Sequence, residues 1–565
     1  MGKRILVVGG VAGGASAAAR ARRLDEAAEI IIFERGPHVS FSNCSLPYYL
    51  SGIIEDSAEL VLMDPVRFKN QFNIEVRVNN EVIKIKRTEK KVVVRDLNSG
   101  EEYEESYDKL ILSPGASPIV PASIEGVNQK HVFTVRNVVD VTKIKEYLEF
   151  NNIEDVAVVG GGFIGVEVTE NLHLAGKRVS LIEALDQIMS PFDFDMAQLL
   201  HKEMLDNGVD LILNDAVVKI NTDSVELSSG KKVAAGAVIM AIGVFPETGL
   251  AREAGLEIGE TGGIKVDHNY LTSDKDIYAI GDAIEVYHRL IRKKTRLPLA
   301  GPAQRQARAA VDHIYNIPHR NNGVIGSSVV KIFDLNAACT GLNEKAASMA
   351  GISYDFVYII PGDKVGLMPD SNPMHFKLLY EYPTGRILGA QAIGKGNVDK
   401  RIDVIAALIL MDGTLEDLKE LELCYAPPFG TAKDVLNQAA LVALNQLYGQ
   451  YKQVPVSKVR ELVEKRAFIL DIRERREYQA GHLKNAVNIP LSELRARVDE
   501  IPRDQPVYVH CRSGQRSYYA VMVLQHMGFE DVYNIAGSFL GISYYEYSQD
   551  QLTGREKILT DYNFN

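Results

Sequence analysis

The stretch DVAVVGGGFIG, residues 155–165, decides the fold of this chain. An apolar strand pattern leads into Gly160, Gly162 and Gly165, and the next strand pattern, RVSLIE, ends in the acidic residue Glu183. The order of strand, glycine loop, helix, strand and acid is typical of a βαβ unit that binds a dinucleotide pyrophosphate at a helix N-terminus. The sequence therefore predicts an α/β fold with a dinucleotide site at this loop.

The residues around this loop indicate which dinucleotide binds. Glu183 is placed to accept hydrogen bonds from the adenosine ribose, and residues 184–195 contain no Arg or Lys that would bind a 2′-phosphate. We therefore expect NADH, with NADPH less favoured. The predicted NAD contacts are Gly160, Gly162, Ile164, Gly165, Glu183 and Gly243.

A second glycine loop, VVGGVAGG at residues 7–14, follows a buried-strand pattern and precedes a helix rich in Ala and Arg. Its fingerprint is imperfect, because Val11 stands at the middle position between Gly9 and Gly14. The strand after the helix ends in Glu34, which is placed to hold a ribose hydroxyl. These features predict a second dinucleotide site near the N-terminus.

The single cysteine in SFSNCSLPYYL, residues 40–50, is Cys44. A dithiol enzyme would place a second cysteine where Tyr49 stands, so Cys44 would have to work alone. The polar neighbours of Cys44, Asn43 among them, favour a reactive thiol over a buried apolar one. Because two nested dinucleotide sites imply electron passage from a nicotinamide to a flavin, we expect Cys44 to accept the electrons, with a low thiol pKa.

The composition excludes several classes of protein. A chain of 565 residues is long enough for three to four domains, and its net charge of −11 argues against a nucleic-acid partner. No apolar run approaches the roughly 20 residues needed to cross a bilayer, and no leader pattern opens the chain, so we expect a cytoplasmic protein. The four cysteines are widely separated, which predicts neither a disulfide framework nor a metal site.

The C-terminal part begins anew after a polar linker at residues 449–455. There the strand pattern of VYVHCRSGQRS, residues 507–517, runs into Cys511 and a short polar loop whose N–H groups can converge on sulfur. A cysteine phosphatase would need an arginine where Ser517 stands, so the loop favours a persulfide over a phosphate. A non-catalytic docking module is the alternative. The predicted persulfide loop comprises Arg512, Ser513, Gly514, Gln515 and Arg516 beside Cys511.

Over nearly its whole length the chain resembles the coenzyme A-disulfide reductase family, within the single-cysteine pyridine nucleotide-disulfide oxidoreductases, fused to a C-terminal rhodanese domain. The matching segments are residues 7–24, 40–49, 160–167, 279–283, 299–308, 398–406, 425–429, 471–473, 481–482 and 511–517. Two segments, LILSPGA at 110–116 and DIYAIGDA at 276–283, resemble the remaining flavin contacts of disulfide reductases, although Asp282 alone would pass as a turn residue. The expected FAD contacts are Gly9, Gly10, Gly13, Gly14, Glu34, Arg35, Ser113, Gly115, Gly281 and Asp282.

The resemblance further implies a coenzyme A moiety near Cys44 and a homodimer in which Tyr425 serves the partner's active site. From the residues alone, the cluster of Arg20, Arg22 and Arg23 is either a solvated helix face or a clamp for an anionic ligand. By family analogy, the coenzyme A contacts would be Arg20, Arg22, Ser40, Lys69 and Arg305.

The sequence departs from this family at three positions. Leu367 and Met368 stand where the family has a tyrosine pair, and Gln304 replaces an asparagine. Because the missing hydroxyl is the group credited with polarising coenzyme A disulfide, we expect a different preferred substrate.

The predicted function is NADH-driven, FAD-dependent reduction of persulfides or polysulfides, such as coenzyme A persulfide, with release of sulfide. Cys44, Asn43 and Tyr425 would carry the reduction, while Cys511 delivers sulfane sulfur. The alternatives are a coenzyme A-disulfide reductase, an NADH oxidase or peroxidase that cycles through a sulfenic acid, and a redox-sensing interaction module. The predicted domains are FAD-binding 1–120 with 245–322, NAD(P)H-binding 121–244, dimerisation 323–448 and rhodanese 456–565.

Overall fold

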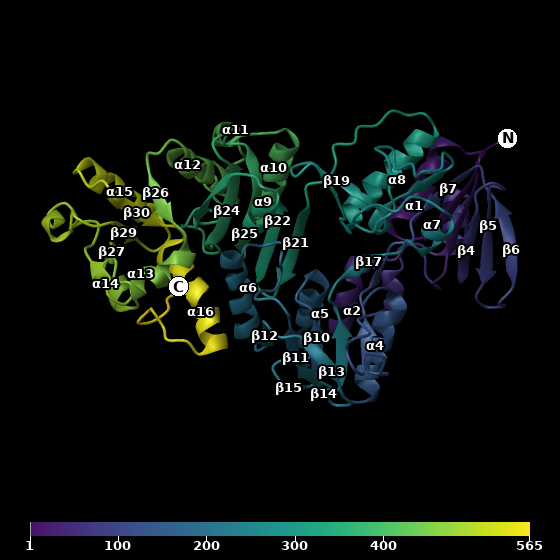
Figure 1. The fold of residues 1–565 in the computed structure, drawn as a ribbon, viewed down its shortest axis with the longest axis horizontal. Helices are drawn as coiled ribbons and strands as arrows, with labels where there is room; N and C mark the ends of the chain where they lie inside the picture. Colours follow the sequence, from purple (N-terminus) through teal and green to yellow (C-terminus); the bar gives the residue numbers. More distant parts are fainter. Residues whose placement is uncertain (1, 565) are drawn as a thin grey trace. The chain divides into compact units, whose positions relative to one another are not determined.

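The computed structural model describes residues 2–564, which form two compact units (Figure 1). Unit 1 contains the N-terminal residues up to Ala184 and Asp215–Val324, and unit 2 contains Leu185–Asn214 and the chain from Ile325 onward. Each unit is described by itself. No helix among the described residues is long and apolar enough to span a bilayer.

The first sheet of unit 1 is parallel, with strand order β18-β7-β1-β2-β3. Alternate residues of its strands face opposite ways: Ile5 and Val7 pack on the helices α1 and α8, whereas Leu6 and Val8 pack toward the antiparallel sheet β4-β5-β6. Both faces are therefore covered. The elements are β1 (Arg4–Val8), α1 (Ala12–Leu24), β2 (Glu29–Glu34), β3 (Glu75–Val78), β4 (Asn80–Lys86), β5 (Lys91–Asp96), β6 (Glu102–Ser106), β7 (Lys109–Leu112), β18 (Ile277–Ala279) and α8 (Ala300–Ile314).

The second parallel sheet of unit 1 contains β11, β10, β16 and β9 in that order. A short helix, α2, packs against α4 and α5 and brings the Cys44 segment to this sheet's helices. The elements are α2 (Leu46–Ser51), β9 (Val132–Thr134), α4 (Val138–Phe150), β10 (Asp155–Val159), α5 (Phe163–Leu174), β11 (Arg178–Ile182) and β16 (Ala237–Met240).

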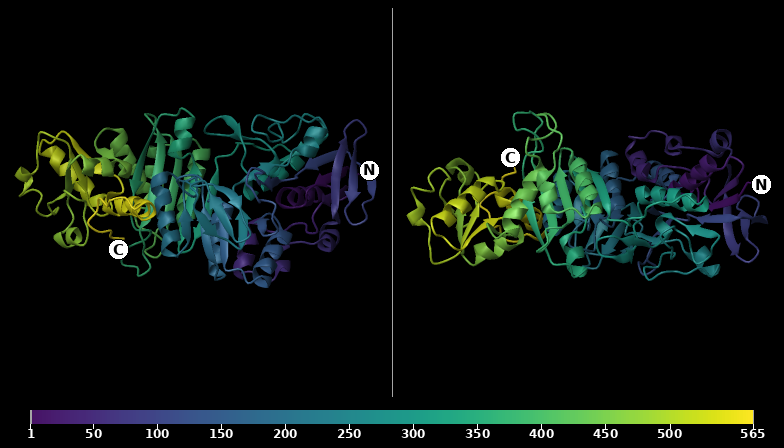
Figure 2. Two further views of the ribbon diagram at one scale, coloured as in Figure 1. Left: turned by 60° about the horizontal axis from the view of Figure 1, so that its bottom comes forward. Right: turned by 90° about the horizontal axis from the view of Figure 1, so that it is seen from above.

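Unit 2 contains an antiparallel sheet with strand order β21-β22-β25-β24-β23. Helix α10 lies along β22 and β25, and α12 packs beside β23 and β24. This region is coloured teal to green in Figure 2. The elements are α6 (Phe194–Asp206), β21 (Ser327–Ile332), β22 (Leu335–Gly341), α9 (Glu344–Met349), β23 (Tyr354–Ile359), β24 (Met374–Glu381), β25 (Ile387–Gly394), α10 (Val398–Leu410), α11 (Leu415–Glu420) and α12 (Val435–Leu447).

A buried lysine forms ion pairs that link the start of α6 to this sheet. Lys377 of β24 has no exposed surface, and its Nζ lies 3.1 Å from Asp193, 2.8 Å from Asp195 and 2.5 Å from Glu344. Burial alone would lower the pKa of Lys377, but the three carboxylates raise it. The ammonium group therefore neutralises part of a buried acidic cluster.

Replacing Lys377 by methionine should destabilise unit 2 by about 3–5 kcal/mol, because the carboxylates would lose their buried counter-charge. Guanidinium unfolding of the variant would measure the loss, with Lys331→Met on exposed β21 as the matched control. The loss should shrink as the pH falls, because protonation removes the uncompensated charges. An equal loss in both variants, or one that does not depend on pH, would contradict this assignment.

The C-terminal part of unit 2 is a second α/β layer, with the parallel sheet β26-β30-β29-β27-β28. Its last helix, α16, packs against α6, and Ser548 Oγ donates a hydrogen bond to the carbonyl oxygen of Gln198 at 3.2 Å. The elements are β26 (Lys452–Val454), α13 (Val459–Glu464), β27 (Phe468–Asp471), α14 (Arg475–Gln479), β28 (Val487–Asn488), β29 (Val507–His510), α15 (Gln515–His526), β30 (Val532–Ile535) and α16 (Ser538–Thr553).

The two parallel sheets with glycine loops, the antiparallel sheet and the C-terminal α/β layer confirm the predicted fold class. The residue boundaries given above for the four domains stay a prediction.

Candidate active sites

The glycine loop at residues 160–165 has the geometry that its sequence predicts. Gly160 has φ +108°, and a Cβ there would lie 2.5 Å from the Ala241 carbonyl oxygen. Gly165 packs so closely that its Cβ would lie 1.8 Å from the Gly160 oxygen, while Gly162 opens α5 into free space. The backbone at Gly162 is therefore accessible to a ligand.

The N-terminal glycine loop repeats this geometry despite its imperfect fingerprint. Gly9 has φ +90°, and a Cβ on Gly14 would lie 1.8 Å from the Gly9 oxygen, the same separation as in the second loop. Val11 is the N-cap residue of α1, as Gly162 is of α5. Since Gly162 has no contact within 4 Å of its ideal Cβ, this position accepts a side chain.

The acidic residue after each loop supports the loop itself. Glu34 Oε2 accepts the Gly10 N–H at 2.9 Å, and Glu183 Oε2 accepts the Gly161 N–H at 2.7 Å. No side chain among the described residues caps α1 or α5, so N–H groups remain at both helix N-termini. These donors fit the pyrophosphates of two dinucleotides.

The predicted flavin residues from three parts of unit 1 meet beside the first loop. A Cβ on Gly13 would lie 2.6 Å from Ser113 Oγ, and one on Gly281 would lie 3.6 Å from the same atom. The Gly281 N–H donates to Oε1 of buried Gln306 at 2.7 Å, a residue of α8 in the matching segment 299–308 that was not among the predicted site residues. Burial raises the pKa of the neighbouring Asp282 carboxyl.

Sequence reasoning also missed a polar cluster around Arg136. Its Nη1 donates to Ser117 Oγ at 2.7 Å, and Glu247 Oε1 lies 3.0 Å from Arg35 Nη2. Arg136 lies 4.0 Å from the Cβ position of Gly115, and its charge counteracts the raised pKa of Asp282. Arg136 comes from a loop without a recognisable pattern, so no sequence signal could have identified it.

The thiol of Cys44 is exposed at a 3-10 turn, Asn43–Ser45, that leads into α2. Just before it, Ser40 adopts φ +51° and its N–H donates to the Gly10 oxygen at 2.8 Å. Just after it, Ser51 Oγ donates to Asn171 Oδ1 of α5 at 2.7 Å. The cysteine segment is thus attached to both dinucleotide-loop regions of unit 1.

The charges around Cys44 differ from the expectation. Although Cys44 is exposed, neighbouring protein atoms desolvate part of its thiol and raise its pKa, and the carboxylates of Glu167 and Asp282 raise it further. The pKa of Glu167 is itself raised to about 7, by burial and by Glu170. The protein side chains around Cys44 therefore do not lower its pKa, and the low pKa expected beside the flavin stays a prediction.

The predicted coenzyme A residues divide into two groups. Arg22 is buried, and its guanidinium donates to the carbonyl oxygens of residues 25, 26, 72 and 73, so its role is structural. Arg20 is held by Asp312, with Nε 2.7 Å from Oδ1. Lys69 and Arg305 are exposed. The structure therefore argues against Arg22 as a phosphate ligand and leaves Lys69 and Arg305 accessible.

Tyr425, Cys424 and Leu367 lie on exposed loops of unit 2. Tyr425 is 48% exposed and Leu367 is 92% exposed, so neither side chain belongs to the core. The Val365 N–H donates to the Gly430 oxygen at 3.1 Å, which joins the two loops. An accessible Tyr425 hydroxyl is compatible with a contact to another subunit.

Cys511 directly follows β29 and begins the predicted loop, with 1% of its surface exposed. The Gly514 N–H donates to its Sγ at 3.1 Å, and Ser517 Oγ donates at 3.5 Å. Gly514 has φ +110°, which permits this turn into α15. The serine at the position where a phosphatase has its arginine therefore contacts the sulfur directly.

The two loop arginines differ in their surroundings. Arg516 is paired with Glu477 of α14 through two contacts of 2.7 Å, and this pairing lowers the pKa of Glu477. Arg512 forms no ion pair among residues 2–564. One net positive charge, at Arg512, therefore remains on the loop.

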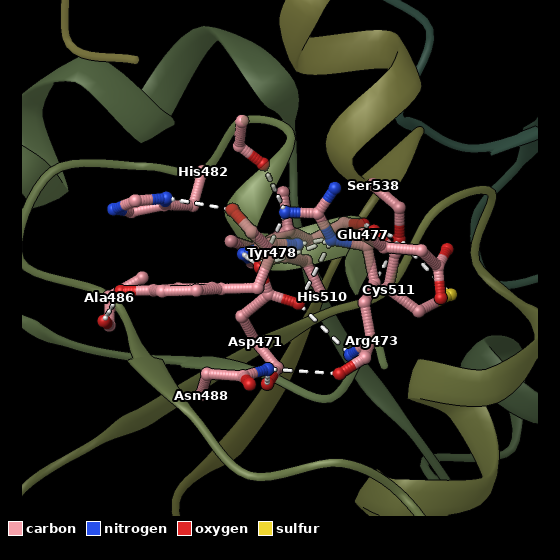
Figure 3. Close-up of polar contacts among 12 residues, drawn as sticks. Asp471, Arg473, Glu477, Tyr478, His482, Ala486, Asn488, His510, Cys511 and Ser538 are labelled. Carbon is pink, nitrogen blue, oxygen red and sulfur yellow. Dashed lines mark hydrogen bonds and ion pairs between the residues drawn. The ribbon is translucent and has the colours of Figure 1, made fainter. Parts of the chain in front are cut away.

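A buried charged group supports the loop from below (Figure 3). Asp471 accepts hydrogen bonds from Arg473 Nε at 3.0 Å and Nη2 at 2.6 Å, and Arg473 Nη2 also donates to the Gly481 oxygen at 2.8 Å. His510 lies beside them, with Nε2 3.7 Å from Asp471, and burial lowers its pKa. This network fixes the strand end that carries Cys511.

Comparison with known families matches three parts of the chain. Residues 3–307 match the pyridine nucleotide-disulphide oxidoreductase family, residues 327–435 its dimerisation domain, and residues 456–544 the rhodanese-like domain. Coenzyme A disulfide reductase of Staphylococcus epidermidis is 34% identical over 435 residues, which cover 77% of this chain and 98% of that protein.

Two solved structures are similar over almost the entire chain. Reduced CoADR-RHD of Bacillus anthracis has a TM-score of 0.93 and 43% identity, covering 96% of this chain and 98% of that one. A NAD-dependent persulfide reductase from A. fulgidus has a TM-score of 0.91 and 35% identity, covering 95% of this chain and 99% of that one.

Proposed function

This chain belongs to the pyridine nucleotide-disulphide oxidoreductase family, and from that premise we propose that it reduces persulfides or polysulfides at Cys44 with electrons from NADH. Sulfide is the product, and the rhodanese domain supplies sulfane sulfur through Cys511. The observation that carries the proposal is the presence of two differently built thiol sites in one chain. Cys44 is exposed beside two dinucleotide loops, whereas Cys511 lies in a cradle of N–H and O–H donors.

The family implies FAD and NAD(P)H, and the two uncapped glycine loops fit both. When bound, FAD carries an electron pair from the nicotinamide to sulfur. Gly9 to Gly14, Glu34, Ser113, Gly281 and Asp282 would hold it, and the second loop with Glu183 would hold NADH.

The reduction at Cys44 requires a balanced exchange of bonds. The Cys44 thiolate attacks the carbon-bound sulfur of a persulfide RSS⁻, the S–S bond breaks, and with one proton the outer sulfur leaves as HS⁻. Two electrons and one proton then cleave the Cys44–SR disulfide, which restores the Cys44 thiolate and releases RSH. Because Glu167 and Asp282 raise the pKa of the Cys44 thiol, the fraction of thiolate at neutral pH is low unless the bound cofactor stabilises it.

Coenzyme A is the proposed carrier of the persulfide. Lys69 and Arg305 are exposed cations for its phosphates, and Ser40 lies on the segment between Cys44 and the first loop. The proposed assembly is a homodimer in which the dimerisation domain places Tyr425 at the other subunit's Cys44. Asn43, exposed next to Cys44, is the proposed polar contact of the reacting sulfur.

We expect NADH-dependent kcat/KM to be about 10²-fold higher with coenzyme A persulfide than with coenzyme A disulfide. Reduction of the disulfide needs a proton donor for the leaving thiolate, a contribution of about 10² or more, and Leu367 and Met368 supply no hydroxyl. Stopped-flow oxidation of NADH with each substrate would measure the ratio. Equal or faster turnover of the disulfide would instead favour a coenzyme A-disulfide reductase with an accessory tail.

A further inference from the structure

A cavity of about 200 Å³ lies in unit 2 where the antiparallel-sheet region meets the persulfide loop. One wall consists of Arg512, Ser513 and Leu540 of the rhodanese domain. The opposite wall consists of residues 360–362 and 371–373, which belong to the dimerisation domain. We propose that this cavity binds the thiol-bearing arm of the small thiol that takes sulfane sulfur from Cys511; this inference rests on the proposed function.

The rhodanese wall is part of the loop that surrounds the sulfur. Arg512 and Ser513 are the two residues between Cys511 and Gly514, whose N–H donates to the Cys511 Sγ at 3.1 Å. The Leu540 N–H donates to the Arg512 oxygen at 3.0 Å, which fixes this wall to α16. A ligand in the cavity therefore lies against the backbone that holds the reacting sulfur.

The opposite wall is also rigidly built. The Asp363 N–H donates to the Asn372 oxygen at 2.9 Å, and the Met374 N–H donates to the Pro361 oxygen at 2.8 Å. Ser371 Oγ donates to the Lys364 oxygen at 3.1 Å. These bonds close the base of the loop at residues 362–373, so its two ends form a fixed surface opposite the persulfide loop.

The lining determines the chemistry of the occupant. Ile360, Pro361 and Leu540 are apolar, Ser371, Asn372 and Ser513 offer hydrogen-bonding groups, and Arg512 is the one unpaired loop cation. This combination suits a chain of alternating aliphatic and amide groups that ends in a thiolate. At about 30 Å³ per water, the volume equals about seven waters, which accommodates the thiol end of such an arm but not a nucleotide.

The transfer itself is balanced without an added oxidant or reductant. The acceptor thiolate RS⁻ attacks the outer sulfur of the Cys511 persulfide, the bond between the two sulfurs of that persulfide breaks, and Cys511 leaves as a thiolate. The new S–S bond joins the acceptor sulfur to the transferred sulfur in RSS⁻, so one neutral sulfur atom has moved from Cys511 to the acceptor. With thiosulfate as donor, the Cys511 thiolate attacks the outer sulfur of thiosulfate. The S–S bond of thiosulfate breaks, sulfite leaves, and Cys511 carries the persulfide.

The test fills the cavity from the wall that lies outside the rhodanese domain. The holoenzyme is loaded with thiosulfate in the absence of NADH, and its discharge is followed with coenzyme A, 2-mercaptoethanol or cyanide. Ser371→Phe should lower kcat/KM for coenzyme A by about tenfold or more and leave the two short acceptors within about twofold, because only coenzyme A has an arm to exclude. Ser348→Phe, on exposed α9, is the matched control and should change none of the three rates.

The outcomes separate this inference from the proposed function. Unchanged discharge to coenzyme A in Ser371→Phe would overturn the cavity assignment while leaving the delivery of sulfur intact. Failure of coenzyme A to discharge wild-type Cys511 would overturn the delivery step and the cavity assignment with it. If Ser371→Phe also slows discharge to cyanide, the smaller Ser371→Leu replaces it, and equal slowing of all three acceptors there would again overturn the assignment.

Discussion

Replacing Cys44 by serine should abolish NADH-driven release of sulfide from coenzyme A persulfide, with a loss in kcat of roughly 10³-fold or more. A serine hydroxyl cannot form the mixed disulfide, and in the described chain no other thiol lies in the segment that links the two glycine loops. Sulfide production and NADH oxidation, followed together in single-turnover and steady-state experiments, would measure the loss.

The control uses the second exposed cysteine. Cys424→Ser makes the same change of one atom on a surface loop of unit 2 and should leave sulfide release unchanged. Persistent sulfide release by Cys44→Ser would refute the proposed mechanism. NADH oxidation in Cys44→Ser without sulfide would show that the flavin passes electrons directly to oxygen.

Replacing Cys511 by serine should eliminate sulfide production that starts from thiosulfate and coenzyme A, again by roughly 10³-fold or more. Reduction of preformed coenzyme A persulfide should keep its wild-type rate, since that step uses only Cys44. The physical reason is the cradle: Gly514 N–H and Ser517 Oγ contact the Cys511 sulfur, and no persulfide can form there on a serine oxygen.

The two donors provide an internal control for folding. If Cys511→Ser loses both activities, the loop has been damaged and Cys511→Ala should be measured in its place. Thiosulfate-dependent sulfide from either variant at the wild-type rate would show that sulfane sulfur bypasses the rhodanese domain.

Local sequence patterns predict much of this fold because they encode interactions between near neighbours. The pattern EIIIFE gives β2 at residues 29–34, the predicted strand that ends in Glu34. The glycine loops are equally local, since the close contact of Gly14 with Gly9 spans five residues. The loop with Val11 has the same shape as the loop with Gly162, because both residues are helix N-caps. The space beside this position is open, so a side chain is tolerated there.

Other features of the sites depend on pairing between distant residues. Glu477 meets Arg516 across 39 positions, and Gln306 meets Gly281 across 25. The sequence leaves Arg22 either on a solvated helix face or in a clamp for an anion, whereas in the structure it is buried and donates to the carbonyl oxygens of residues 72 and 73. The raised pKa of the Cys44 thiol likewise follows from Glu167 and Asp282, whose proximity no local pattern reveals.

The packing of α16 on α6 has a consequence for the history of the chain. The relative from Staphylococcus epidermidis is matched over 98% of its length but over only 77% of this chain, whose tail from residue 456 matches the rhodanese-like domain. Here the tail covers α6 through Ser548 and the edge-on pair of Tyr545 with Phe194, so trimming it would leave apolar surface bare. The tail therefore cannot be removed without disturbing α6, so we expect the proposed sulfur donor and the proposed reductase to stay on one polypeptide.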